Sequence, residues 1–223
     1  MDEIKLWNDV SKNIQFFTSR TAEDIPQNSG IYAWFLPFWI YKDNIETSLD
    51  FVQKAMLFDS KEFSLDNPKR GLAERDVNLS FNWDSIDINV KKNKKKDDLK
   101  ISGWENIKEN NEVKSVFTET LMKGSIFSRP LYLGRTNNLN ARYNQHLIIN
   151  PDKSCFNTRF NYFVENYNID KNSSEKVSLR VDDLIFACIS ISKGQNELFE
   201  KSNVTETLEK ILINIAQPPF SNR

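Results

Sequence analysis

The feature that most constrains the fold is an apolar, aromatic run from Ile31 to Tyr41, which reads IYAWFLPFWIY. A membrane-spanning helix needs about 20 such residues, so this run is too short to cross a bilayer. Pro37 also interrupts it. The turn sequence PQNSG precedes the run and ends at Gly30, so the segment GIYAWFL predicts a buried β-strand. We therefore expect a β-sheet at the centre of this 223-residue chain, and no membrane partner.

The remaining patterns indicate an α+β fold in which helices flank a small sheet. Strand signals occur at residues 129–134 and 182–191, and alternation of apolar and polar residues predicts strands within 77–90. Apolar residues recur at helical spacing in segments 3–17, 46–58, 105–124, 137–149, 157–167 and 204–216. Either Asn137 or Asn138 can cap the helix that follows the 129–134 strand.

Composition excludes some classes of function. Cys155 and Cys188 form no CxxC pair and the chain has one histidine, so we expect neither a zinc site nor a disulfide framework. The net charge of -1 does not by itself require a nucleic-acid partner, although binding depends on the local surface. The first ten residues, MDEIKLWNDV, are acidic where a signal peptide would be basic. We therefore expect a cytoplasmic protein.

A lysine-rich run, KKNKKKDDLK, occupies residues 91–100. A solvated loop is the simpler interpretation of such a run. The alternative is a flexible arm in which Lys94 and Lys95 contact phosphate groups.

Several side chains suited to phosphate chemistry follow in the second half of the chain. Arg142 and His146 are four residues apart, so one face of a helix carries both. Tyr132 lies on the strand that leads into this helix, and Glu206 and Glu209 lie one turn apart on the last helix. Each residue alone has an ordinary structural explanation, so the information lies in their combination and order.

The ordered set GIY (30–32), YLG (132–134), Arg142, His146 and Glu209 resembles the GIY-YIG nuclease family, in its restriction-endonuclease-like branch. In that family the arginine falls ten residues after the second tyrosine, as Arg142 does here. A histidine four residues further, like His146, occurs in some branches.

The end of the chain extends this resemblance. Glu209 lies nine residues before Pro218, which matches the spacing of the family's metal-binding glutamate and proline. An asparagine follows in the family, and Asn222 stands one residue away from that position. The resemblance covers residues 29–36 and 127–223.

The resemblance implies a single nuclease domain over residues 1–223. Its core would comprise residues 27–36 and 127–223, preceded by an N-terminal helical extension over 1–26. Residues 37–126 would form a large insertion between the first two strands, where the family usually has a short hairpin.

The family also implies roles for the residues that match. Glu209 would bind a divalent ion, Mg²⁺ or Mn²⁺, and Arg142 would stabilise the charged phosphate in the transition state. Tyr32 would take a proton from the attacking water, and His146 would relay it. Tyr132 would orient the water or bind the phosphate. Which of the two tyrosines acts as the base stays open.

Four further residues are expected to contact the substrate: Arg135, Asn222, Lys94 and Lys95. The activity implied by the resemblance is metal-dependent cleavage of double-stranded DNA by a type II restriction-type enzyme, for which a homodimer would be usual. One alternative is a structure-specific or nonspecific nuclease of DNA repair or phage defence. Another is a nucleic-acid-binding module that has lost catalysis.

Overall fold

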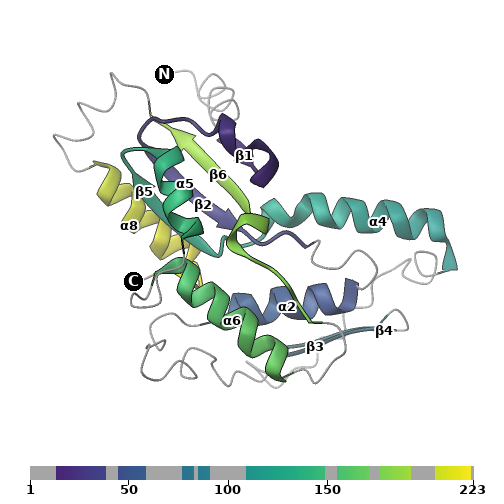
Figure 1. Cartoon of the computed structure of the whole chain (residues 1–223). Coiled ribbons are helices and arrows are strands. Elements are labelled where there is room, and N and C mark those ends of the chain that lie inside the picture. Colours follow the sequence, from purple (N-terminus) through teal and green to yellow (C-terminus); the bar gives the residue numbers. More distant parts are fainter. Residues whose placement is uncertain are drawn as a thin grey trace.

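A four-stranded antiparallel sheet with helices on both sides forms the centre of the molecule (Figure 1). The computed structural model describes residues 14–38, 45–58, 77–82, 85–90, 109–148, 155–170, 176–191 and 204–221. The strand order is β1-β6-β2-β5. The four strands are β1 (Ile14–Phe17), β2 (Gly30–Phe35), β5 (Tyr132–Thr136) and β6 (Ile185–Ser190). This architecture confirms the expected α+β class.

Helices and a separate hairpin complete the described chain. The α-helices are α2 (Ile45–Leu57), α4 (Asn111–Lys123), α5 (Leu139–Leu147), α6 (Phe156–Asp170) and α8 (Val204–Ala216). Short 3₁₀ helices are η1 (Ser19–Asp24), η3 (Gly124–Phe127) and η4 (Val181–Asp183), and the two-stranded hairpin is β3 (Val77–Asn82) with β4 (Ser85–Val90). Strands β2 and β5 pair directly although α2, β3, β4 and α4 lie between them in the chain.

One face of the sheet carries the aromatic core. Tyr32 on β2 lies opposite Gly134 on β5, and Trp34 lies opposite Tyr132. Because successive side chains of a strand alternate between the two faces, these side chains share one face. Helix α5 covers it, and its Tyr143 ring stacks on Trp34 with the ring centroids 5.3 Å apart.

Helix α8 covers the opposite face, on the other side of the sheet from α5 (Figure 1). Arg135 follows Gly134 along β5, so its side chain points away from the aromatic core. It meets Glu206 and Glu209 of α8 there. Strand β5 thus carries Tyr132 on one face and Arg135 on the other.

The helix expected over residues 3–17 is wrong for its last four residues. Residues 14–17 form strand β1, in which Phe17 lies opposite Phe186 of β6 and is buried. Backbone pairing with β6 and burial of Phe17 outweigh the local helical spacing, because tertiary contacts commonly override a periodic pattern. Residues 3–13 lie outside the described chain.

The other described elements agree with the expectations. Helices α2, α5, α6 and α8 and strands β2, β5 and β6 form where the sequence indicated them, and the 77–90 segment is the β3–β4 hairpin. Helix α4 spans Asn111–Lys123, within the segment expected to be helical, of which residues 105–108 lie outside the described chain. Asn138 is the cap of α5, since its side chain accepts a hydrogen bond of 2.8 Å from the Ala141 N–H. Within the described residues, none of the helices has both the length and the apolar character needed to cross a membrane.

Candidate active site

The side chain of Tyr32 lies at the centre of a buried hydrogen-bonded group. Its hydroxyl oxygen lies 2.8 Å from Nε2 of His146 and accepts a 3.0 Å hydrogen bond from Nε of Arg142. Both partners come from α5, four residues apart, so the helix presents them to β2 on one face. Tyr132 lies beside them, with its ring centroid 6.0 Å from that of Tyr32 and 5.1 Å from that of His146. We call Tyr32, Tyr132, Arg142 and His146 the tyrosine–histidine cluster.

The glycine of each tripeptide makes room for this arrangement. A Cβ atom on Gly134 would lie 2.6 Å from the Tyr32 hydroxyl oxygen and 3.1 Å from the Tyr132 ring. A Cβ atom on Gly30 would lie 2.4 Å from the carbonyl oxygen of Ile189. A side chain at either position would therefore displace a strand or the reacting hydroxyl.

The hydrogen bonds limit the proton positions within the cluster. A guanidinium can only donate, so the Tyr32 oxygen accepts from Arg142. The direction of the contact between Tyr32 and Nε2 of His146 depends on the histidine tautomer. With the ring proton on Nδ1, Nε2 accepts the hydroxyl proton of Tyr32.

Burial and charge keep both groups uncharged. Burial raises the pKa of Tyr32 well above its usual value; Tyr132 adds to the rise and Arg142 opposes it. Burial, followed by the positive charges of Arg142 and Arg159, lowers the pKa of His146 to about 3. At neutral pH the pair is therefore a neutral phenol hydrogen-bonded to a neutral imidazole.

The four members of the cluster differ in their access to solvent. Tyr32 is 1% exposed and His146 is 6% exposed, whereas Tyr132 and Arg142 are only partly buried. Tyr132 and Arg142 are therefore the members of the cluster that are accessible from solvent, and Tyr32 and His146 are buried.

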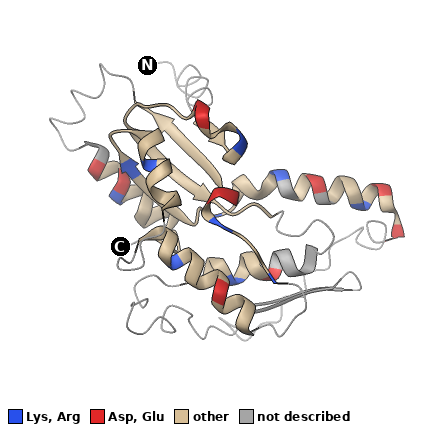
Figure 2. Ribbon diagram, viewed as in Figure 1, with Lys and Arg blue, Asp and Glu red and all other residues tan. Residues whose placement is uncertain are grey.

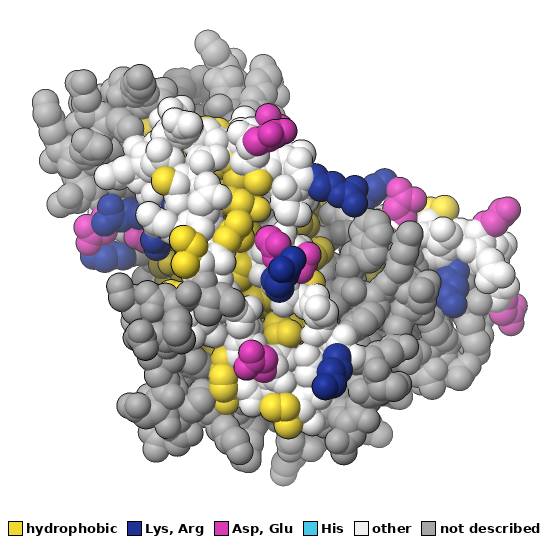
Figure 3. Space-filling model, viewed as in Figure 1, with side chains coloured by type: hydrophobic (Ala, Val, Ile, Leu, Met, Phe, Trp, Pro, Cys, Tyr) yellow, Lys and Arg dark blue, Asp and Glu magenta, His cyan; other side chains and the backbone are white. Residues whose placement is uncertain are grey.

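A second group of polar residues lies on the other face of β5. Nε of Arg135 is 3.1 Å from a carboxylate oxygen of Glu209, and a terminal nitrogen of the same guanidinium is 3.5 Å from a carboxylate oxygen of Glu206. Nζ of Lys210 is 2.7 Å from the second oxygen of Glu206. We call Arg135, Glu206, Glu209 and Lys210 the charged edge. Figures 2 and 3 show acidic and basic side chains gathered where β5, α5 and α8 meet.

The structure brings together four of the five expected site residues, Tyr32, Tyr132, Arg142 and His146. Glu209 makes its ion pair with Arg135 and makes no hydrogen bond or ion pair with the cluster, as far as the described residues extend. The expected substrate contacts Lys94, Lys95 and Asn222 lie outside the described chain, whereas Arg135 belongs to the charged edge.

The charged edge brings two carboxylates to one guanidinium. Glu206 and Glu209 both contact Arg135. No cluster of three or more potential metal-binding side chains occurs within the described part of the chain. Glu206 and Glu209 are the carboxylates of this region that could hold a divalent cation.

Reasoning from the sequence did not identify two parts of this region. Arg159 of α6 is 1% exposed and contributes to the electrostatics of His146. The sequence contains an indication of this buried arginine, because Arg159 lies among Phe156, Phe160 and Phe163 on the apolar side of a helix, where an arginine is unusual. The C-terminal turn after α8, which binds both Arg159 and β5, left no local signal.

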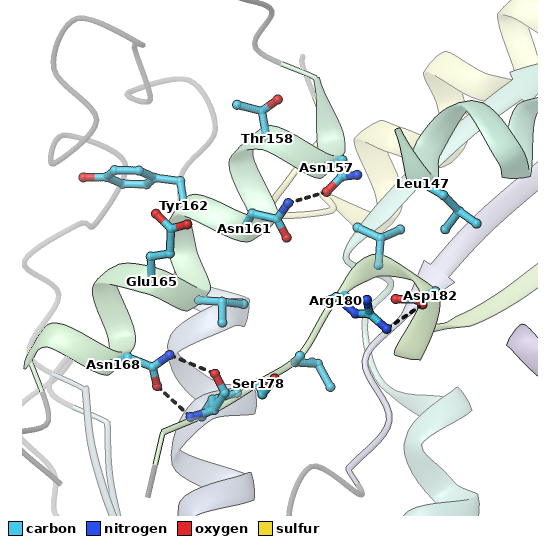
Figure 4. A pocket seen from close by; sticks show the side chains of 14 residues that line it. Leu147, Asn157, Thr158, Asn161, Tyr162, Glu165, Asn168, Ser178, Arg180 and Asp182 are labelled. Atoms are coloured by element: carbon cyan, nitrogen blue, oxygen red, sulfur yellow. Dashed lines mark hydrogen bonds and ion pairs between the residues drawn. The ribbon is translucent and has the colours of Figure 1, made fainter. Parts of the chain in front are cut away.

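A separate cavity of about 670 Å³ lies between α6 and residues 176–183 (Figure 4). Its wall includes Asn157 and Asn161, whose side chains are hydrogen-bonded to each other, and the ion pair between Arg180 and Asp182. None of the five expected site residues lines it. The tyrosine–histidine cluster has the more specific chemistry, so we place the candidate active site there and not in this cavity.

No family model, curated protein or solved structure matches this chain. The resemblance to GIY-YIG nucleases therefore rests on the sequence motifs alone.

Proposed function

We propose that this protein is a divalent-metal-dependent endonuclease of the GIY-YIG type that hydrolyses phosphodiester bonds in DNA. The form we favour is a type II restriction-type enzyme acting on double-stranded DNA as a homodimer. The observation that carries the proposal is the hydrogen-bonded set of Tyr32, Arg142 and His146 behind the more accessible Tyr132.

The cost of this set supports a functional interpretation. A phenol, an imidazole and a guanidinium lie together in a largely aromatic core, where polar groups lose hydration. Apolar side chains would fill the same space without that cost. Strongly shifted pKa values in coupled groups, as for Tyr32 and His146, are common at catalytic sites.

The cluster supplies a path for the proton of an attacking water. As the Tyr32 oxygen takes a proton from water, its own proton can pass along the 2.8 Å contact to Nε2 of His146. The raised pKa of Tyr32 and the lowered pKa of His146 both oppose this transfer in the free protein. The negative charge of the reacting phosphate would therefore have to stabilise the protonated imidazole. Tyr132 would orient the water, since it is the more exposed of the two tyrosines.

Arg142 connects the proton path to the phosphate. Its Nε donates to Tyr32, and one terminal nitrogen donates to Gln145 at 3.1 Å. The other terminal nitrogen is directed at a phosphate in our proposal, where a fixed guanidinium stabilises the charge of the transition state. Arg142 would therefore act both on the base and on the reacting group.

The metal would be held by Glu209, with Glu206 one turn away. When bound, Mg²⁺ or Mn²⁺ supplies positive charge that polarises the phosphate oxygens. Arg135, which is ion-paired with Glu209, would turn to a phosphate of the substrate when the metal is bound. A phosphate bridging Arg142 and Glu209 would lie across the Gly134–Thr136 end of β5, so we propose that DNA binds there. Asn222, Lys94 and Lys95 stay proposed substrate contacts.

Cleavage assays on matched substrates test this proposal. Purified protein is incubated with supercoiled plasmid, linear phage DNA, a branched junction and single-stranded RNA, each with Mg²⁺ and with EDTA. Discrete Mg²⁺-dependent bands from linear DNA are expected for a restriction enzyme. Preference for the junction, or a smear, would support the repair or defence nuclease instead. Binding without cleavage would support the catalytically silent module.

A further inference from the structure

Arg159 is a buried cation on α6 that the proposed mechanism does not use. It is 1% exposed, and Nε and one terminal nitrogen donate to the carbonyl oxygen of Phe220, at 3.1 and 2.5 Å. Removing a guanidinium from water costs several kcal/mol, so a buried arginine is retained only where hydrogen bonds hold it. Burial lowers the pKa of Arg159, opposed by the nearby Tyr132 and Cys155. The bonds to Phe220 connect Arg159 to the C-terminal end of the chain.

The carbonyl that Arg159 binds belongs to a turn that closes the edge of β5. The Phe220 N–H donates to the Leu131 carbonyl at 2.9 Å. The Ser221 hydroxyl accepts from the Leu133 N–H at 3.1 Å and lies 3.3 Å from the Leu133 carbonyl. The turn therefore takes the place of a neighbouring strand on either side of Tyr132.

The turn is also anchored in the core by its aromatic ring. Phe220 is fully buried and stacks on Phe58, with ring centroids 4.3 Å apart. Its ring lies 6.2 Å from that of Phe156, which in turn lies 4.9 Å from the ring of Tyr132. Arg159 thus ties together α6, the C-terminal turn and the strand that carries Tyr132.

We propose that Arg159 is a positioning residue of the candidate site, which clamps the C-terminal turn onto β5 and so sets Tyr132 against His146. The part of this proposal that concerns catalysis rests on the proposed function. The buried positive charge of Arg159 also lowers the pKa of His146, as does Arg142 on α5. The other titratable groups beside His146 are Tyr32 on β2 and Tyr132 on β5.

The single histidine of the chain gives a test that does not need activity. NMR of the imidazole reports the tautomer and the pKa of His146 alone. In Arg159→Met the pKa of His146 is expected to rise from about 3, because one of the two cations that lower it is gone; burial, the larger cause, keeps the pKa below the ordinary 6.5. Arg159→Lys keeps the charge and is expected to keep the low pKa. Arg180→Met, at a surface arginine, is the control for loss of charge.

Cleavage kinetics on the same variants test the positioning role. Arg159→Met is expected to lower kcat at least about tenfold with little change in KM, since Tyr132 is displaced while the DNA-binding surface is kept. Ser221→Ala loosens the turn without removing charge, so it is expected to lower kcat and leave the pKa of His146 unchanged. If Arg159→Met does not fold, Arg159→Lys and Ser221→Ala decide the question.

The outcomes separate this inference from the proposed function. A folded Arg159→Met with an unchanged His146 pKa and wild-type kcat overturns the positioning role, while the nuclease assignment stands. A shifted His146 in a protein that cleaves no nucleic acid supports the clamp and contradicts the nuclease. Wild-type kcat in Ser221→Ala would also contradict positioning through the turn.

Discussion

The Tyr32 hydroxyl and the His146 imidazole form a 2.8 Å hydrogen bond in which both groups are uncharged. The two residues lie 114 positions apart in the chain and meet because α5 packs on the face of β2 that carries Tyr32. Arg142 completes the set by donating to the same Tyr32 oxygen. The account of function depends on this relationship.

Removing the Tyr32 hydroxyl should abolish turnover. Tyr32→Phe leaves Nε2 of His146 and Nε of Arg142 without their common partner, so we expect a loss of about three powers of ten in kcat. Tyr143→Phe is the matched control, because Tyr143 is equally buried and its ring lies at the same 5.4 Å from Phe186. Single-turnover cleavage measures both. Similar losses in the two variants would reduce Tyr32 to a packing role.

His146 should make stability depend on pH. Between its folded pKa of about 3 and an unfolded value near 6.5, only the unfolded chain binds the proton. Stability contributed by the neutral histidine is therefore complete above about pH 6.5 and is lost as pH falls toward 3, by up to about 1.4 kcal/mol per pH unit.

His146→Gln cannot titrate and should lack this component. Urea unfolding at about pH 7.5, 6 and 5 gives the free energy of unfolding of the wild type and of the variant. Taking the difference between the two proteins at each pH removes the contribution of the carboxylates that both contain. The free energy of unfolding should fall more steeply in the wild type. Parallel curves would mean that His146 has an ordinary pKa in the folded state.

Replacing Arg142 should reduce catalysis more than binding. Arg142→Ala loses the contact with Tyr32 and the charge proposed to stabilise the transition state, so turnover should fall by about three powers of ten or more. Arg142→Lys keeps the charge without the planar fork, and should recover only part of the activity. Arg180→Ala, at the surface, should cleave normally. A tenfold loss or less in Arg142→Ala would assign that residue a structural role.

Gly134 should not tolerate a methyl group. In Gly134→Ala the new Cβ would lie 2.6 Å from the Tyr32 hydroxyl oxygen, so we expect a loss of about 1–3 kcal/mol in stability and much of the activity. Gly124→Ala is the control, since nothing lies within 4 Å of its Cβ position. Thermal unfolding compares the two. Equal stability of both variants would contradict the close contact between β2 and β5.

Local patterns were enough to predict most of the fold. The strand that begins at Gly30 and the helix capped by Asn138 follow from turn residues, apolar spacing and a capping side chain. The pattern failed at Ile14–Phe17, where spacing typical of a helix gave way to pairing with β6. A four-residue strand at a sheet edge is defined by its partner and not by its own sequence.

The candidate site was predictable only as a set of residues. The order of Tyr32, Tyr132, Arg142 and His146 indicated a cluster, and these four meet in space. The pairing of Arg135 with Glu209 was not predictable, because it joins elements 74 residues apart. The clamp formed by Arg159 depends likewise on contacts between distant segments, which no local pattern encodes.

The most direct test of the central claim is Mg²⁺-dependent DNA cleavage by Glu209→Ala beside the wild type and Glu206→Ala. Glu206 lies one turn from Glu209 and also contacts Arg135, so its variant controls for loss of the ion pair. We expect cleavage by the wild type and Glu206→Ala, and none by Glu209→Ala, which should still shift DNA in a gel with Ca²⁺. Full activity of Glu209→Ala, or cleavage by the wild type that persists in EDTA, would contradict a metal-dependent nuclease built on this site.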